Sequence, residues 1–229
     1  MERLIYMTGR LILLLVVSAV ISYLIGSLNS AIISVRILKG KDVRDFGSHN
    51  AGLTNTLRCF GKGPAAMTLA GDLLKGVVAV LLSRLLFSLF LPDIGSTVFL
   101  GYFSGIFSIL GHIFPLYYGF KGGKGVLVSS SILLVVDPLT FCIIIPFFIL
   151  MVAITRYVSV SSITSAVVYP FLTFGVQRFV RHMELKWVLL DAGLTVVTSI
   201  ILIWMHRENI VRLRNGTENK FGSKSNKAD

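Results

Sequence analysis

Four polar segments carry the side chains of this sequence that could do chemistry, and each is rich in glycine, hydroxyl, amide or basic residues. Glycines let the backbone approach a ligand closely, and loop amides converge on anions. Serine, threonine and arginine add donors that suit phosphate. The segments therefore predict a phosphate-binding site. They cover residues 46–63, 111–125, 156–163 and 206–220.

The first two segments have the strongest anion-binding character. FGSHNAGLTNTLRCFGKG combines four glycines with Ser48, Thr54 and Arg58, although an ordinary loop with helix caps is an open alternative. GHIFPLYYGFKGGKG places Lys124 in a glycine-rich turn before an apolar run, where a helix N-terminus binds anions. A nucleotide-binding P-loop has Ser or Thr after its lysine, and glycine stands there, so nucleotide hydrolysis is unsupported.

The remaining candidates have competing structural interpretations. His112, at the edge of an apolar run, is either a hydrogen-bonded structural residue or a base or substrate donor. Ser161 and Ser162 open a helix whose free amides suit an anion. Asn209 is uncharged within a basic run, HRENIVRLRNGTENK, whose arginines are expected to anchor the inner face.

Asp72 and Lys75, three residues apart in an apolar run, share a helix face and are expected to pair in a supporting role. Other carboxylates on the inner face are few, so the sequence predicts no metal and no cofactor. A His-x4-Asp acyltransferase motif and Gly-x-Ser-x-Gly are both missing. A shortage of acids fits anionic substrates, which carboxylates repel.

The composition indicates a membrane protein. The 229 residues are 54% hydrophobic and 14% charged, with a net charge of +11 and a mean hydropathy of +0.80. A soluble protein needs more charge to cover its surface. Basic residues without interleaved aromatics do not indicate nucleic-acid binding. The basic excess instead predicts positively charged loops on one side of a membrane.

The sequence predicts an all-α, polytopic integral membrane protein that forms one domain over residues 1–229. Seven transmembrane helices are expected, or five if the short runs that meet at Asp137-Pro138, or the 94–116 run, are re-entrant. An outside N-terminus places fifteen of the 22 Lys and Arg residues inside and five outside, which predicts a cytoplasmic C-terminus. The motif loops (about 36–63, 111–125 and 156–162) and the tail (206–229) then share one face. The predicted spans are 11–35, 64–91, 94–116, 125–136, 138–155, 161–177 and 186–205.

Taken together, the motifs resemble those of the bacterial acyl-phosphate:glycerol-3-phosphate acyltransferases, the PlsY family. GSHNAGLTN, Arg58 and DLLKG are similar to its first motif. The stretches 111–125, RYVSVSS and 206–218 are similar to its second, third and tail motifs. The resemblance covers nearly the whole chain. His49 and Leu53 depart from it, because Gly and Ala are usual there.

The resemblance implies a seven-helix enzyme of the bacterial cytoplasmic (inner) membrane. It transfers a fatty acyl group from acyl phosphate to the 1-hydroxyl of glycerol 3-phosphate, and lysophosphatidic acid and phosphate are the products. By motif position, Ser48, Arg58, Lys124, Ser161 and Ser162 hold phosphate together with the amides of Gly122 and Gly123. Thr54, His112 and Asn209 position glycerol phosphate or its hydroxyl.

Acyl phosphate is already activated, so the resemblance favours a substrate-assisted route, in which its own phosphate takes the hydroxyl proton, over His112 as general base. Membrane lipid and the two substrates are the expected partners, and the enzyme that forms acyl phosphate is a candidate partner. Two other classes stay open: a small organophosphate transporter and a non-catalytic lipid-binding subunit. The absence of symmetric broken spans in two halves disfavours the transporter.

Overall fold

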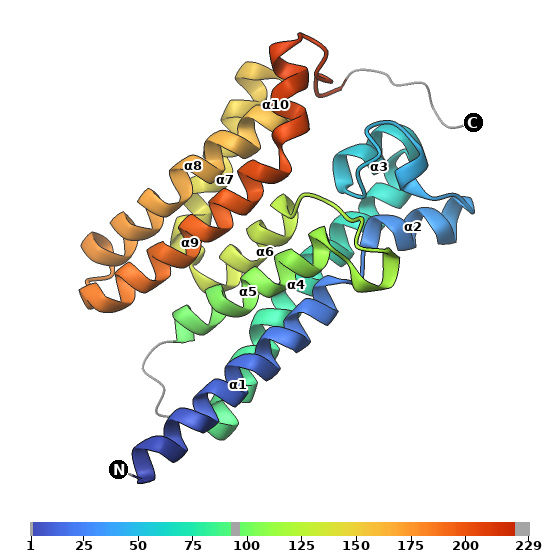
Figure 1. The fold of residues 1–229 in the computed structure, drawn as a ribbon. Coiled ribbons are helices and arrows are strands. Elements are labelled where there is room, and N and C mark those ends of the chain that lie inside the picture. Colours follow the sequence, from blue (N-terminus) through green and yellow to red (C-terminus); the bar gives the residue numbers. More distant parts are fainter. Residues whose placement is uncertain (1, 93–96, 223–229) are drawn as a thin grey trace.

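The computed structural model describes residues 2–92 and 97–222, with side chains from residue 8 onward, and all regular secondary structure in this part of the chain is helical (Figure 1). Short 3₁₀-helices occupy Val43–Asp45 and Leu116–Tyr118, and a short π-helix occupies Val176–Val180. The α-helices are α1 (Glu2–Gly26), α2 (Ser30–Lys39), α3 (Leu53–Phe60), α4 (Lys62–Phe90), α5 (Thr97–Ile113), α6 (Val126–Val136), α7 (Pro138–Thr155), α8 (Val158–Gly175), α9 (Leu185–Met205) and α10 (Arg207–Arg214).

Among the residues described, six helical segments are long and apolar enough to cross a membrane. They confirm the expected all-α membrane class. The predicted fourth span is the shorter helix α6. Its 11 residues rise about 16 Å, roughly half of a 30 Å hydrocarbon core. A seventh crossing through α6 therefore stays a prediction.

The first predicted span, 11–35, is wrong as a continuous helix. α1 ends at Gly26, and α2 begins at Ser30, where the Asn29 side chain accepts a hydrogen bond from the Ile32 amide at 3.0 Å. A side-chain cap of this kind starts a new helix even within an apolar run. The third predicted span begins at residue 94, and the predicted tail extends to 229, so both reach beyond the described residues.

Two helix groups make up the bundle (Figure 1). Helices α1, α4, α5 and α6 lie together, and α7, α8 and α9 form the second group. Within the first group α1 crosses α5 closely, because a Cβ at Gly26 would collide with the Ser108 carbonyl and one at Gly111 with the Tyr23 carbonyl. Helices α2, α3 and α10 gather at one end of the bundle. This end carries the motif segments.

Candidate active site

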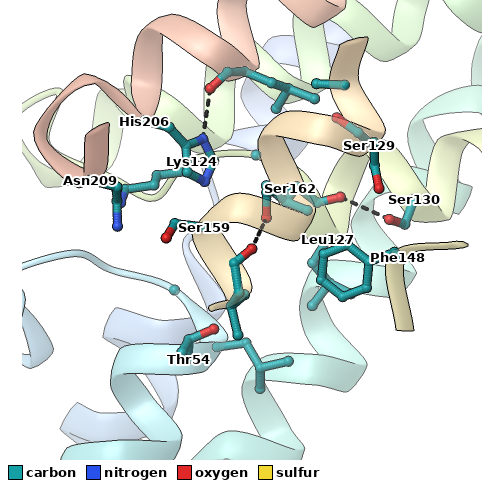
Figure 2. Close-up of a pocket in the computed structure, with 18 of the residues that line it drawn as sticks. Thr54, Lys124, Leu127, Ser129, Ser130, Phe148, Ser159, Ser162, His206 and Asn209 are labelled. Atoms are coloured by element: carbon teal, nitrogen blue, oxygen red, sulfur yellow. Dashed lines mark hydrogen bonds between the residues drawn. The ribbon is translucent and has the colours of Figure 1, made fainter. Parts of the chain in front are cut away.

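A cavity of about 440 Å³ collects residues from all four motif segments at this end of the bundle. The four segments, which were expected on one face, thus line one cavity in the structure. Figure 2 shows Lys124 near His206 and Asn209, with Ser159 below them, Thr54 lower still, and Leu127 and Phe148 to the right. The predicted site residues that line it are Ser48, Thr54, Arg58, His112, Lys124, Ser162 and Asn209.

Lys124 is held in a chain of polar contacts that links the second and fourth segments. Its ammonium donates to the amide oxygen of Asn209, and Asn209 Nδ2 donates to Glu218 Oε1 at 2.6 Å. Arg212 Nε donates to the other carboxylate oxygen of Glu218 at 2.8 Å. The carboxylate thus fixes Asn209 and Arg212, and Asn209 in turn orients the lysine.

The electrostatics of this chain favour anion binding. Burial, and next the charge of Arg212, lower the pKa of Lys124 to about 8, so the ammonium is largely charged at neutral pH. Burial raises the pKa of Glu218, but hydrogen bonds from Asn209 and Arg212 outweigh it and hold this pKa below its ordinary value. Glu218 is therefore an anion paired within the protein, which leaves the lysine charge available to a ligand.

Arg58 gives the cavity a second cation. It lies half-buried on α3 and lines the cavity. Across residues 8–92 and 97–222 its guanidinium has no hydrogen-bond or ion-pair partner. A guanidinium carries five donors in a fixed fork that matches phosphate oxygens. Arg58 is therefore placed to bind a phosphate group.

The two histidines of the cavity differ in protonation pattern. His112 Nδ1 lies 2.8 Å from the Lys75 ammonium, which also pairs with Asp72 at 2.8 Å. An ammonium only donates, so this ring nitrogen accepts and a neutral His112 carries its proton on Nε2. This buried group of Asp72, Lys75 and His112 confirms the expected pairing and makes His112 a donor.

His206 has the opposite arrangement. Its Nδ1 lies 2.8 Å from the Leu202 carbonyl oxygen, to which it donates, so Nε2 is the acceptor. Burial lowers the pKa of His206 to about 4. The ring is therefore neutral at physiological pH and is a weak base. It lines the cavity, although sequence reasoning named it only within the tail motif.

Three predicted contacts do not reach the cavity. The Gly122 amide donates to Ile113 O at 3.0 Å and the Gly123 amide to His112 O at 3.1 Å, so neither is free for phosphate. A Cβ on Gly122 would collide with the His112 carbonyl and one on Gly123 with the His112 ring, which explains both glycines. Ser161 is buried and donates to Tyr157 O at 3.0 Å, whereas Ser159, one helical turn before Ser162, lines the cavity.

Acids are few in the sequence, but two of them lie at the site. Asp72 and Glu218 line the cavity. Each is paired with a cation, Lys75 at 2.8 Å and Arg212 at 2.8 Å. Their charges are thereby offset before a substrate arrives. Among the described residues no group of three or more His, Cys, Asp or Glu side chains is arranged to hold a metal ion.

The loop that presents Ser48 is organised by Asn55. The Asn55 side chain accepts from the Ser48 amide at 3.0 Å and donates to Phe46 O at 2.9 Å. Within this loop His49 has φ +56°, the left-handed region that glycine adopts freely. His49 Nδ1 also donates to Arg44 O at 2.8 Å. His49 therefore keeps the left-handed backbone that the glycine of the motif would adopt, and its side-chain hydrogen bond to Arg44 supports this conformation.

Replacing His49 by glycine is expected to change the free energy of unfolding by less than about 1 kcal/mol, because relief of the left-handed backbone offsets the lost hydrogen bond. His49→Val keeps the backbone conformation without that hydrogen bond and is expected to cost about 1–3 kcal/mol. Thermal unfolding of both variants in detergent tests this pair. Equal loss in both would mean that the backbone conformation of residue 49 does not matter.

The fold and site define a multi-pass integral membrane protein with a cavity that is lined by cations at one end and by apolar residues at the other. The sequence profile of the glycerol-3-phosphate acyltransferase family matches residues 16–216. The chain belongs to this family.

Relatives and solved structures agree with the family. A glycerol-3-phosphate acyltransferase from Clostridioides difficile (strain 630) is 40% identical over 91% of this chain and 96% of its own length. A glycerol-3-phosphate acyltransferase from Chlorobaculum parvum is 38% identical over 90% of this chain and 96% of its own length. The crystal structure of PlsY, an integral membrane glycerol 3-phosphate acyltransferase in its glycerol 3-phosphate form, has a TM-score of 0.73 and 30% identity, covering 91% of this chain and 96% of that one. Its lysophosphatidic acid form has a TM-score of 0.69 and 29% identity, with 91% and 95% covered.

Proposed function

We propose that this protein transfers a fatty acyl group from acyl phosphate to the 1-hydroxyl of glycerol 3-phosphate, the first acylation of phospholipid synthesis. One observation carries the proposal: a single cavity joins a cationic end, with Arg58 and Lys124, to an apolar arm that includes Phe148. Such a cavity suits reactants that carry phosphate and a fatty chain. The related PlsY structures, in glycerol 3-phosphate and lysophosphatidic acid forms, support the same reaction.

The cavity offers separate environments for the two parts of the acyl donor. Arg58, Lys124 and the Ser48 hydroxyl bind phosphate oxygens, and Thr54 and the Nε2–H of His112 position glycerol phosphate. The acyl chain lies along the apolar arm beside Leu127 and Phe148. Binding energy at both ends holds the hydroxyl and the acyl carbon together, which removes much of the entropic barrier to their reaction.

The chemistry needs no covalent intermediate. The 1-hydroxyl oxygen bonds to the acyl carbon, the bond between that carbon and the phosphate oxygen breaks, and the hydroxyl proton moves to the phosphate. His112 donates through Nε2 and is not free to take this proton while Lys75 donates to Nδ1. The pKa of His206, about 4, makes it a poor base at neutral pH. Both features support the substrate-assisted route, in which Arg58 and Lys124 stabilise the phosphate charge.

Incubation of the purified protein in lipid with acyl phosphate and labelled glycerol 3-phosphate tests the reaction. Formation of labelled lysophosphatidic acid is the expected result. Uptake of glycerol 3-phosphate into vesicles without product would instead favour an organophosphate transporter. Binding of both compounds with neither product nor uptake would favour a lipid-binding subunit.

Membrane orientation follows from charge and from helix placement. The predicted excess of basic residues on the motif side indicates a cytoplasmic active site in the bacterial inner membrane. The start of α1 and helix α10 lie at opposite ends of the bundle, which supports an outside N-terminus and an inside tail. A cytoplasmic site also gives access to water-soluble glycerol 3-phosphate and to the enzyme that forms acyl phosphate, its proposed partner.

Replacing His112 by glutamine is expected to preserve turnover, because the glutamine amide also donates, and to raise KM for glycerol 3-phosphate about tenfold through poorer alignment. Steady-state kinetics on both substrates measure the effect. His182→Gln, at an exposed position outside the cavity, is the matched control. Loss of turnover in His112→Gln with unchanged affinity for both substrates would replace this role with general-base catalysis.

A further inference from the structure

The apolar arm of the cavity is lined by residues of α6, α7 and α8. On α7 the lining residues recur with helical spacing, at Phe141, Ile144, Ile145 and Phe148. On α8 the same cavity is lined by serines near the cationic end and by Ala166 and Tyr169 farther along. The wall thus changes from hydroxyl to apolar as it leaves Lys124. This change is what a chain attached to a phosphate head requires.

Solvent and lipid access decrease along the arm. Ile149 is the lining residue of α7 nearest the cationic end of the cavity, and it is 60% exposed. Ile144, farther along the arm, is 7% exposed. Thr140, one turn farther, is fully buried and does not line the cavity. The arm therefore opens sideways to the bilayer at its mouth and is enclosed by protein at its far end. An acyl chain can enter the arm beside Ile149, and protein surrounds it by the time it reaches Ile144.

Tyr169 forms the floor of this arm. It is the last residue of α8 that lines the cavity, and it belongs to the same buried apolar cluster as Leu133 on α6 and Ile144 on α7. Its ring is almost completely buried and lies 6.5 Å, between ring centroids, from the ring of Tyr102. Two packed aromatic rings move less easily than an aliphatic side chain, so this floor is rigid.

Behind the floor lies a polar layer, so a longer chain can gain only the space that the Tyr169 ring occupies. Asp137 pairs with Arg181 at 3.0 Å and accepts from the Thr140 hydroxyl at 2.7 Å. Gln177 and Asp191 belong to the same electrostatic surroundings and are fully buried. A hydrocarbon end gains nothing by displacing such groups, because the contacts of Asp137 with Arg181 and Thr140 would be lost.

The length of the arm matches one leaflet. Ser159 and Tyr169 are ten residues apart on α8, which corresponds to about 15 Å at the helical rise. A bilayer core is about 30 Å thick, so one leaflet is about 15 Å. The arm therefore accepts an acyl chain about as long as those of the surrounding membrane.

We propose that Tyr169 is a specificity-determining residue that sets the longest acyl chain this enzyme uses. This inference rests on the proposed acyl transfer. Shortening the side chain at 169 lengthens the arm, and enlarging Ala166, about one turn nearer the phosphate site, shortens it. The two substitutions therefore shift the preferred chain length in opposite directions.

The test measures turnover in lipid with a homologous series of saturated acyl phosphates, from shorter to longer than one leaflet. Tyr169→Ala is expected to raise the ratio of long-chain to optimum-chain kcat/KM about tenfold, and Ala166→Phe to lower it about as much. Val167→Phe adds the same ring to the neighbouring exposed position of α8 and is expected to keep the wild-type profile. A ratio of two chains in one preparation is unaffected by the fraction of folded protein.

A second measurement does not require turnover: the rise in thermal unfolding midpoint caused by each acyl phosphate. The chain length that stabilises most is expected to increase in Tyr169→Ala and to decrease in Ala166→Phe. Wild-type length profiles in both variants would overturn the role of Tyr169 while leaving acyl transfer intact. Wild-type protein that makes no lysophosphatidic acid would contradict the proposed function, and the unfolding profiles would still decide whether Tyr169 limits chain length.

Discussion

Replacing Lys124 by alanine is expected to lower kcat/KM by a factor of about one hundred to one thousand, the effect of removing one preorganised donor from a site where charge develops. The lysine lies in a partly buried cavity, where its ammonium donates to an uncharged amide, that of Asn209. Steady-state assays in lipid measure the loss. Lys121→Ala, an exposed lysine of the same loop, is the matched control. Wild-type turnover in Lys124→Ala would contradict the assignment of Lys124 to phosphate.

The pH dependence gives a second measurement on the same residue. The pKa of Lys124 is about 8, and kcat/KM reports ionisations of the free enzyme. Because the ammonium form binds phosphate, kcat/KM is expected to fall as the pH rises through about 8. Lys124→Arg keeps its charge at every accessible pH and is expected to move this fall to higher pH. An unchanged alkaline limb in that variant would assign the titration to another group.

Replacing Lys75 by methionine is expected to reduce the free energy of unfolding by about 3–5 kcal/mol, because the Asp72 carboxylate then stays buried without its cation. Both side chains are almost completely buried, and His112 accepts from the same ammonium. Denaturant or thermal unfolding in detergent measures the change. Leu74→Met, on the exposed side of α4, is the control for the new side chain.

The double variant Asp72→Asn/Lys75→Met separates the ion pair from packing. Removing both charges leaves no uncompensated ion, so the double variant is expected to be more stable than Lys75→Met alone. If the two substitutions added without coupling, the ion pair would not be the source of the effect.

Local signals in the sequence predicted most of the helices. The predicted span 138–155 coincides with α7, because Asp137 accepts the Thr140 amide at 3.3 Å and Pro138 follows it at the helix start. The break between α1 and α2 was missed, because apolar residues continue on both sides of Asn29 and dominate a hydropathy window. Gly26, where α1 ends, and the Asn29 cap were the local signals for that break.

The candidate site was predictable by residue type and less so by contact. Motif spacing identified Lys124 and Asn209, which the structure brings together across 85 residues of sequence. No local pattern indicated that Glu218 orients Asn209, since charge counts treat every tail carboxylate alike. The use of the Gly123 amide was also misjudged, because a glycine-rich turn before a helix has free amides only if nearby carbonyls are satisfied elsewhere.

The sideways opening at Ile149 has a consequence for how fast such an enzyme works in a cell. In the proposed reaction the fatty substrate arrives by lateral diffusion, so the quantity that governs occupancy is the mole fraction of acyl phosphate among membrane lipids, not its amount per volume of cytoplasm. Glycerol 3-phosphate, in contrast, is sensed as an ordinary aqueous solute. One cavity thus takes one substrate from the plane of the membrane and the other from the aqueous volume. Membrane growth itself dilutes the acyl phosphate.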